Sequence, residues 1–215
     1  MIAKPPPAFP SMRIGLLGGS FNPPHEGHRH ISVAALQRLQ LHKVWWLVTP
    51  GNPLKSGRGL ASLEERIAAA RTIAAHPHIE VTGFEVALPS PYTIDTVRFL
   101  QRRYPGVKFV WLMGADILAQ LHRWRDWTQL FSRIPILVLD RPGARYRGLA
   151  SPAAVRFDAA RIPVEMVSAL PDRQPPVWSY LNLPLCSLSS TALRAAPEQA
   201  NAQAQNKFQP ANQVL

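Results

Sequence analysis

The chain alternates between short apolar runs and longer segments with helical spacing. Apolar runs typical of buried strands occur at 13–17, 44–49, 79–84, 107–113 and 135–139. Between these runs, apolar residues recur three or four positions apart, as on one buried helix face, at 27–39, 62–76, 93–104 and 115–121. This alternation predicts an α/β fold: a Rossmann-like, doubly wound, mostly parallel sheet with helices on both faces. In such a sheet, ligands bind beyond the carboxyl ends of the strands, where the strand order reverses.

The second helical segment has the clearest start. Ser62 precedes it and Glu65 follows three residues later, which is the spacing of a capping box. After about residue 142 the pattern is less regular, and we expect two late strands there, at 164–169 and 177–181.

Composition shifts at the two ends suggest the domain bounds. Residues 1–12 are rich in proline and predict a flexible N-terminal extension. The main domain is expected to span 13–195. Residues 196–215, rich in Ala, Gln and Asn, predict a C-terminal tail that frays or is disordered.

The composition is that of a globular protein, with 47% hydrophobic and 17% charged residues. No apolar run reaches the roughly 18 residues that a membrane-spanning helix needs, so we expect no membrane partner. The first thirteen residues lack the apolar stretch of a secretion signal. A single cysteine, Cys186, fits a reducing compartment, and we expect a cytoplasmic protein.

The formal net charge of +11 indicates an anionic ligand. The lysines and arginines are scattered, with no run of four or more, which argues against nucleic acid as the partner. The charge then indicates either a soluble protein with a generally basic surface or a cleft that attracts polyanionic small molecules such as nucleotides. The cleft is favoured only because residues 18–28 independently predict a phosphate site.

The residues 18–28, GGSFNPPHEGH, join the first strand to the first helix. Gly18 and Gly19 let the backbone approach a ligand closely, and the N–H groups that follow favour an anion at the helix start. His25 and His28 lie three apart, so their imidazoles face the same side of a helical turn. This pattern predicts a phosphate site. The alternatives are a plain turn with two surface histidines, or a metal site with His30 as a third ligand.

The same residues resemble the G-G-x-F-D-P-x-H-x-G-H signature of the nucleotidyltransferase superfamily. Members of this superfamily transfer a nucleotidyl group from a nucleoside triphosphate to a phosphate-bearing acceptor. Asn22 stands where the commoner pattern has Asp, and both side chains supply an acceptor that stabilises a turn.

A second superfamily signature, I-S-x-T-x-x-R, resembles the segment 188–194 near the end of the chain. Its hydroxyls can cap a helix or bind phosphate. The alternative to phosphate binding is that these hydroxyls only cap the start of a helix.

Further segments are similar to those of the bacterial nicotinate-nucleotide adenylyltransferase family. They follow successive strands in the family's order, at 50–55, 91–93, 114–116, 124 and 140–143. The resemblance covers residues 13 to 195. It implies transfer of AMP from ATP to nicotinate mononucleotide, which gives nicotinate adenine dinucleotide and pyrophosphate.

The resemblance also implies the site residues. His28, His25 and Arg194 are the expected catalytic residues, with Mg²⁺ carried by the ATP phosphates rather than by the protein. The residues expected to bind ATP are Gly18, Gly19, Ser20, Phe21, His25, His28, Gly114, Asp116, Ser189, Ser190, Thr191 and Arg194. Those expected to bind the acceptor are Asn52, Lys55, Tyr92, Thr93, Trp124, Arg125 and Arg141.

Several of these residues could instead have a purely structural role. Asp116 and Thr93 could be helix N-caps, Lys55 a solvated loop lysine, and Trp124 and Trp127 core residues. For the whole chain, the alternatives are a sister transferase that uses nicotinamide mononucleotide or phosphopantetheine, and a non-catalytic RNA-binding relative. We expect a monomer or a homodimer.

Overall fold

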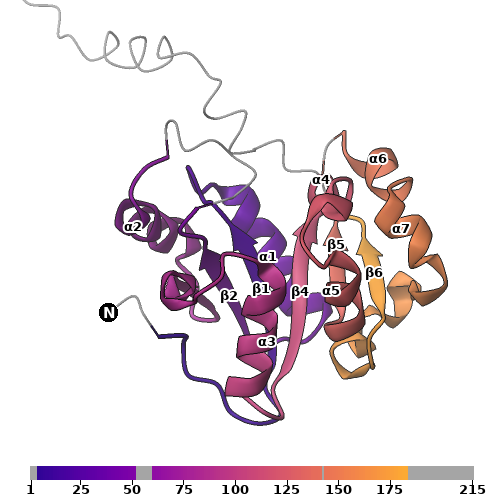
Figure 1. Ribbon diagram of the computed structural model, residues 1–215, viewed down its shortest axis with the longest axis horizontal. Helices are drawn as coiled ribbons and strands as arrows, with labels where there is room; N and C mark the ends of the chain where they lie inside the picture. The colour runs from indigo at the N-terminus through magenta and orange to yellow at the C-terminus, as the bar shows by residue number, and fades with distance from the viewer. Residues whose placement is uncertain (1–3, 52–59, 142, 184–215) are drawn as a thin grey trace, which may run out of the picture.

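The computed structural model describes residues 4–51, 60–141 and 143–183 (Figure 1). Within these ranges, six strands form one sheet in the order β3-β2-β1-β4-β5-β6, and every pairing is parallel. The strands are β1 (Arg13–Gly19), β2 (Lys43–Val48), β3 (Ile79–Thr82), β4 (Lys108–Gly114), β5 (Ile136–Leu139) and β6 (Trp178–Leu181). The strand order confirms the predicted doubly wound sheet.

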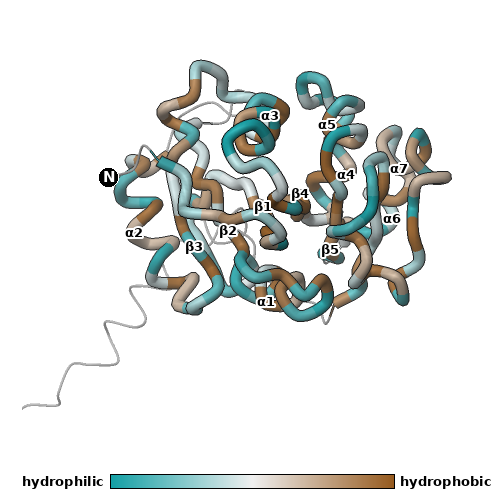
Figure 2. Tube along the Cα trace, turned by 90° about the horizontal axis from the view of Figure 1, so that it is seen from below, coloured by the Kyte–Doolittle hydropathy of each residue, from teal (hydrophilic) through white to brown (hydrophobic). Residues whose placement is uncertain are grey.

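Helices cover both faces of this sheet. Figure 2 shows α3 and α5 on one side of the row of strands and α1 on the other. The α-helices are α1 (Glu26–Arg38), α2 (Leu63–Ala74), α3 (Thr93–Arg103), α4 (Ala115–Leu118), α5 (Trp127–Arg133), α6 (Arg145–Leu149) and α7 (Pro152–Arg156). The 3₁₀ helices are η1 (Phe84–Ala87), η2 (Leu121–Arg123), η3 (Asp158–Ala160) and η4 (Val164–Asp172). None of the helices in the described ranges is long and apolar enough to cross a membrane.

Two consecutive tryptophans in β2 anchor the two layers of the core. Successive side chains of a strand point to opposite faces of the sheet. Trp45 packs in the cluster that includes α3, α4 and α5, whereas Trp46 packs in the cluster that includes α1, α2 and η4. Both side chains are completely buried, so this central strand has no solvent-facing side.

Most predicted elements are confirmed. The capping box is present, because Ser62 Oγ accepts a hydrogen bond from Glu65 N at 3.2 Å and Glu65 Oε2 accepts one from Ser62 N at 2.9 Å. The predicted strand at 177–181 is confirmed as β6.

The predicted strand at 164–169 is wrong, because this segment belongs to η4. Its buried residues include Val167 and Leu170, which lie three apart and therefore share one side of a helical turn. The strand predicted at 79–84 ends earlier, at Thr82, and Phe84 already begins η1.

The segment before β1 is held against the domain, although we expected an extension over 1–12 to be flexible. Tyr104 Oη donates a hydrogen bond to the carbonyl of Pro6 at 2.8 Å, and Ser11 N donates one to Gly106 O at 2.8 Å. The side chain of Met12 packs against the core. Residues 6–12 therefore form part of the packed structure. The domain bounds predicted from the sequence stay a prediction.

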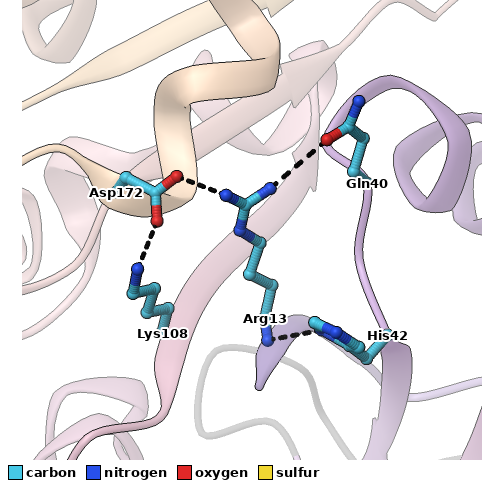
Figure 3. A network of polar contacts seen from close by, with 5 residues as sticks. All are labelled: Arg13, Gln40, His42, Lys108 and Asp172. Atoms are coloured by element: carbon cyan, nitrogen blue, oxygen red, sulfur yellow. Dashed lines mark hydrogen bonds and ion pairs between the residues drawn. The ribbon is translucent and has the colours of Figure 1, made fainter. Parts of the chain in front are cut away.

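An ionic network joins η4 to β1 and β4 at the edge of the sheet where these strands begin, which is the edge opposite their carboxyl ends (Figure 3). Asp172 accepts a hydrogen bond from Arg13 at 2.6 Å through one oxygen and from Lys108 at 2.6 Å through the other. Hydrogen bonding and these two cations lower the pKa of Asp172 below its ordinary value. Arg13 lies on β1 and Lys108 on β4, so one carboxylate connects both central strands to a helix.

Replacement of this carboxylate tests its contribution to stability. We expect Asp172→Asn to lower the free energy of unfolding by about 1 kcal/mol, because partly exposed ion pairs contribute little singly and more as a network. That corresponds to a fall in Tm of about 2–4 °C. Glu165→Gln, an exposed carboxylate on the same η4 that forms no ion pair among the described residues, is the matched control. Thermal denaturation at low and high salt checks this, and a Tm equal to that of the control variant at low salt would contradict it.

Candidate active site

A cavity of about 630 Å³ lies at the carboxyl ends of β1 and β4. It is lined by every predicted site residue that the structure describes: Gly18, Gly19, Ser20, Phe21, His25, His28, Tyr92, Thr93, Gly114, Asp116, Trp124, Arg125 and Arg141. A larger hollow of about 1050 Å³, bordered by α3, α5 and α7, holds none of them. Residues that are distant in sequence therefore meet at one place, as expected where the strand order of a doubly wound sheet reverses.

The other predicted site residues lie outside the described ranges. They are Asn52, Lys55, Ser189, Ser190, Thr191 and Arg194. Cys186 lies outside them too. The roles assigned to all of these residues stay predictions.

The two histidines meet at the start of α1, as their spacing predicted. His25 is the N-cap residue and His28 follows in the first turn, with 3.9 Å between their ring centroids. His28 Nδ1 accepts a hydrogen bond from His25 N at 3.3 Å. A neutral His28 ring therefore carries its proton on Nε2, which leaves this N–H free to donate to a ligand. One turn further along α1, Ser32 Oγ donates a hydrogen bond to the carbonyl of His28 at 2.7 Å and accepts one from Trp46 Nε1 at 2.8 Å.

Both imidazoles are neutral in the ligand-free protein. Burial lowers the pKa of His25 to about 4, assisted by the positive charge of Arg141. Burial also lowers the pKa of His28 to about 3, with further contributions from His25 and Arg141. The two ring nitrogens of His25 are buried without a hydrogen-bond partner among the described residues. Such nitrogens favour a ligand that supplies the missing partner.

The turn between β1 and α1 depends on aromatic packing. Phe21 has a φ of 46°, in the left-handed region, which costs a non-glycine residue roughly 1–2 kcal/mol. Its buried ring stacks on Trp46, with 4.9 Å between centroids and 16° between planes, and lies 4.7 Å from the His28 ring. This packing holds Phe21 in its strained conformation.

Gly18 is required by the core as well as by the ligand side of the loop. A Cβ on Gly18 would lie 2.9 Å from Trp111 Cη2, closer than real Cβ atoms come to their neighbours. This buried indole of β4 gives Gly18 a packing role, and the predicted close approach of the Gly18–Gly19 backbone to a ligand stays a prediction.

Charged side chains follow the carboxyl ends of β4 and β5. Arg141 Nε lies 3.8 Å from Asp116 Oδ1, and Asp116 belongs to the first turn of α4. The N-cap of α4 is Gly114, so the reading of Asp116 as an N-cap is wrong. A Cβ on Gly114 would collide with the Asp116 carboxylate and with Arg141, so a glycine here gives both side chains room beside the cavity.

The start of α3 and the segment after η2 also line the cavity. Tyr92 is the N-cap residue of α3 and Thr93 its first residue, so Thr93 is not the N-cap. The guanidinium of Arg125 lies over the Tyr92 ring, 4.8 Å from its centroid. Trp124 lines the cavity, whereas Trp127 packs edge-on against Phe157 at 6.0 Å. Both tryptophans are partly buried against the core, and Trp124 also lines the cavity, whereas Trp127 does not.

Sequence reasoning missed two groups near this cavity. Glu85 lines it, accepts a hydrogen bond from Thr96 Oγ1 at 2.7 Å, and has a pKa raised to about 7 by burial. Arg66 lies behind the loops and is 2% exposed. A charged residue on the apolar face of a helix is unusual, and that position in the pattern of α2 is the signal that could have identified Arg66.

No three His, Cys, Asp or Glu side chains of the described residues lie close enough together to hold a metal ion. The carboxylates that line the cavity are Glu85 and Asp116, which come from different elements, η1 and α4. The side chains in the described ranges therefore do not form a cage for Mg²⁺, which prefers several oxygen ligands.

Comparisons with known proteins agree with this geometry. The profile of the cytidylyltransferase-like family matches residues 16–196. A protein of Bradyrhizobium sp. (strain ORS 278), named "Probable nicotinate-nucleotide adenylyltransferase", is 54% identical over 183 residues, which cover 85% of this chain and 95% of that protein. A protein of the same name from Methylorubrum extorquens is also 54% identical, with 85% and 99% covered.

The fold is that of a solved enzyme with little sequence similarity. The structure of Plasmodium falciparum nicotinic acid mononucleotide adenylyltransferase complexed with NaAD matches with a TM-score of 0.64 and 17% identity. The match covers 86% of this chain and 83% of that one. The profile match and the extent of identity to the bacterial relatives establish that the chain belongs to the cytidylyltransferase-like family, in its nicotinate-nucleotide adenylyltransferase branch.

Proposed function

We propose that this enzyme transfers the AMP group of ATP to the 5′-phosphate of nicotinate mononucleotide. The products are nicotinate adenine dinucleotide and pyrophosphate. The observation that carries the proposal is the pair of neutral, closely packed imidazoles at the start of α1, with the His25 nitrogens buried and unpartnered among the described residues. A polyphosphate supplies acceptor oxygens for the N–H of a neutral imidazole, and for both ring nitrogens once the ring is protonated.

The donor half of the site is built around these histidines. We assign His28 to the α-phosphate, because its Nε2–H is free while Nδ1 is occupied by the backbone. His25 is assigned to the β- and γ-phosphates, with Arg194 from the end of the chain. The helix start adds backbone N–H groups and a favourable dipole. Asp116 is assigned to the adenosine ribose.

The reaction requires no protein nucleophile. An oxygen of the acceptor phosphate attacks the α-phosphorus in line and forms a P–O bond. The bond from the α-phosphorus to the bridging oxygen breaks, and pyrophosphate leaves with the electron pair. The attacking phosphate is already anionic near neutral pH, so a general base is not needed. Catalysis then comes from positioning and from hydrogen bonds that stabilise the charge on the transferring group.

Mg²⁺ enters as part of the ATP substrate in this proposal. The described side chains offer no cage for it, so the phosphate oxygens hold the ion, and it neutralises part of their charge. The residues of this chain contribute hydrogen bonds and cations around the complex.

The acceptor half of the site lies at the α3 end of the cavity. We assign Trp124 to stacking on the pyridine ring, because a flat aromatic ligand favours a flat partner. Thr93 and the N–H groups at the start of α3 are assigned to the nicotinate carboxylate. Tyr92, Arg125 and Arg141 complete this half, together with Asn52 and Lys55. The cytoplasm is the compartment we propose for the enzyme, on the basis of its single cysteine.

Removal of the His28 imidazole tests the donor assignment. We expect His28→Ala to lower kcat/KM by about 10²–10³-fold, because a hydrogen bond to the transition state is lost. The matched control is His30→Ala, which removes an exposed imidazole that lies on α1 and does not line the cavity. Pyrophosphate release from ATP is the measurement, with Tm as the check on folding. Turnover of the His28 variant close to that of the His30 variant would rule out the assignment.

The depressed histidine pKa values give a pH dependence. In the free enzyme, His25 and His28 are expected to remain neutral down to about pH 4 and 3. Both titrate near 6.5 in the unfolded chain, so the unfolded state binds more protons and stability is lost as the pH falls from about 6.5 toward 4. Bound ATP favours the charged imidazoles and should raise both pKa values. Histidine NMR with and without ATP checks this, and titration of the free enzyme near 6.5 at both sites would contradict it.

The choice between acid and amide acceptors depends on the start of α3. We expect Thr93→Val, which keeps the shape and removes the hydroxyl, to lower kcat/KM for nicotinate mononucleotide by about tenfold. The value for nicotinamide mononucleotide should change less, since its amide carries no charge. Initial rates with both mononucleotides give the ratio. An unchanged acid-to-amide ratio would show that Thr93 does not select the carboxylate.

A further inference from the structure

Arg66 is a buried cation without an acidic partner among the described residues. It lies on the face of α2 that also buries Ile67, Ala70 and Ala74, and it is 2% exposed. None of the ion pairs among the described residues includes it. A buried charge is costly unless hydrogen bonds compensate for it, so the partners of this guanidinium need an explanation.

Those partners are four backbone carbonyls. Nη1 donates to Ser20 O at 2.7 Å and to Thr49 O at 2.8 Å. Nη2 donates to Pro50 O at 3.3 Å, and Nε donates to Ala61 O at 2.9 Å. Ser20 belongs to the turn after β1, while Thr49 and Pro50 follow β2. One side chain therefore connects the two loops that leave the neighbouring strands β1 and β2.

The hydrogen bonds to Ser20 O and Pro50 O fix the orientation of two peptide planes. A trans peptide unit is planar, and its C=O and N–H point in opposite directions. The units Ser20–Phe21 and Pro50–Gly51 are trans, since the cis bonds of the described residues are elsewhere. With their carbonyls turned toward Arg66, the N–H groups of Phe21 and Gly51 point away from it.

The two loops that Arg66 holds border the cavity. Ser20, Phe21 and Gly51 line the cavity, whereas Arg66 does not. No hydrogen bond within the described part of the chain uses the N–H of Phe21 or of Gly51. Two free backbone donors from two loops are thus presented to the same space, held from behind by one guanidinium.

We propose that Arg66 is a positioning residue that aims the N–H groups of Phe21 and Gly51 at phosphate oxygens bound in the cavity. The ligand class, a polyphosphate, rests on the proposed function. The planar fork of arginine suits this task, because it reaches several carbonyls in fixed directions, whereas a lysine offers a single point charge. The strained φ of Phe21 makes its peptide plane the one most in need of such a restraint.

The direct test is an amide NMR titration of the full chain with inorganic pyrophosphate, a probe that needs no turnover. In the wild type, the amide protons of Phe21 and Gly51 should shift downfield until the site is saturated. In Arg66→Lys and Arg66→Met, both shifts should be lost, and the Kd for pyrophosphate should rise by at least about tenfold. Arg71→Met is the matched control, since Arg71 is exposed on the same helix and should leave the Kd unchanged.

Two results would overturn the proposal. If pyrophosphate saturates the wild type and the amides of Phe21 and Gly51 do not move, Arg66 does not act through them. The same conclusion follows if Arg66→Lys lowers Tm but keeps the wild-type Kd and shifts, because its role is then only structural. If Arg66→Met fails to fold, the wild-type and Arg66→Lys arms still decide. Failure of the proposed function is a separate outcome, in which the wild type binds pyrophosphate and transfers no AMP.

Discussion

The site exists because the connections from β1 and β4 leave the sheet toward opposite faces. The chain continues from β1 into α1, which packs in the cluster around Trp46, and from β4 into α4, which packs in the cluster around Trp45. Neighbouring loops that diverge in this way leave a space between them at the carboxyl ends of the strands. The residues that line the cavity come from both of these connections.

The electrostatic design of the cavity follows from the same burial. Arg123, Arg125 and Arg141 supply positive charge around it, and the two histidines that line the same cavity stay neutral. Two more positive charges in a partly dehydrated space would repel one another and the arginines. A polyphosphate changes this balance, because its negative charges favour the protonated imidazoles. The attraction between site and ligand therefore increases as the ligand binds.

Much of the fold was predictable because strand and helix periodicity are local signals. The strands up to β5, the capping box of Ser62 and the meeting of His25 with His28 all follow from spacing along the chain. The error at 164–169 arose where a short apolar segment without clear periodicity was read as a strand, although it forms η4. For Arg66 the spacing along α2 does give a signal, but its contacts with the distant loops do not show in the sequence. The burial that raises the pKa of Glu85 leaves no trace in local spacing.

The contact between Gly18 and Trp111 has a consequence for how this scaffold can be altered. The first glycine of the donor loop is fixed by an indole of the core, so a different ligand in the cavity would not release it from that requirement. Tyr92 and Trp124, which are assigned to the acceptor, also pack against the core while they line the cavity. A designer who changed the ligand of this cavity would therefore have to keep a glycine at position 18, or repack Trp111 together with the new residue.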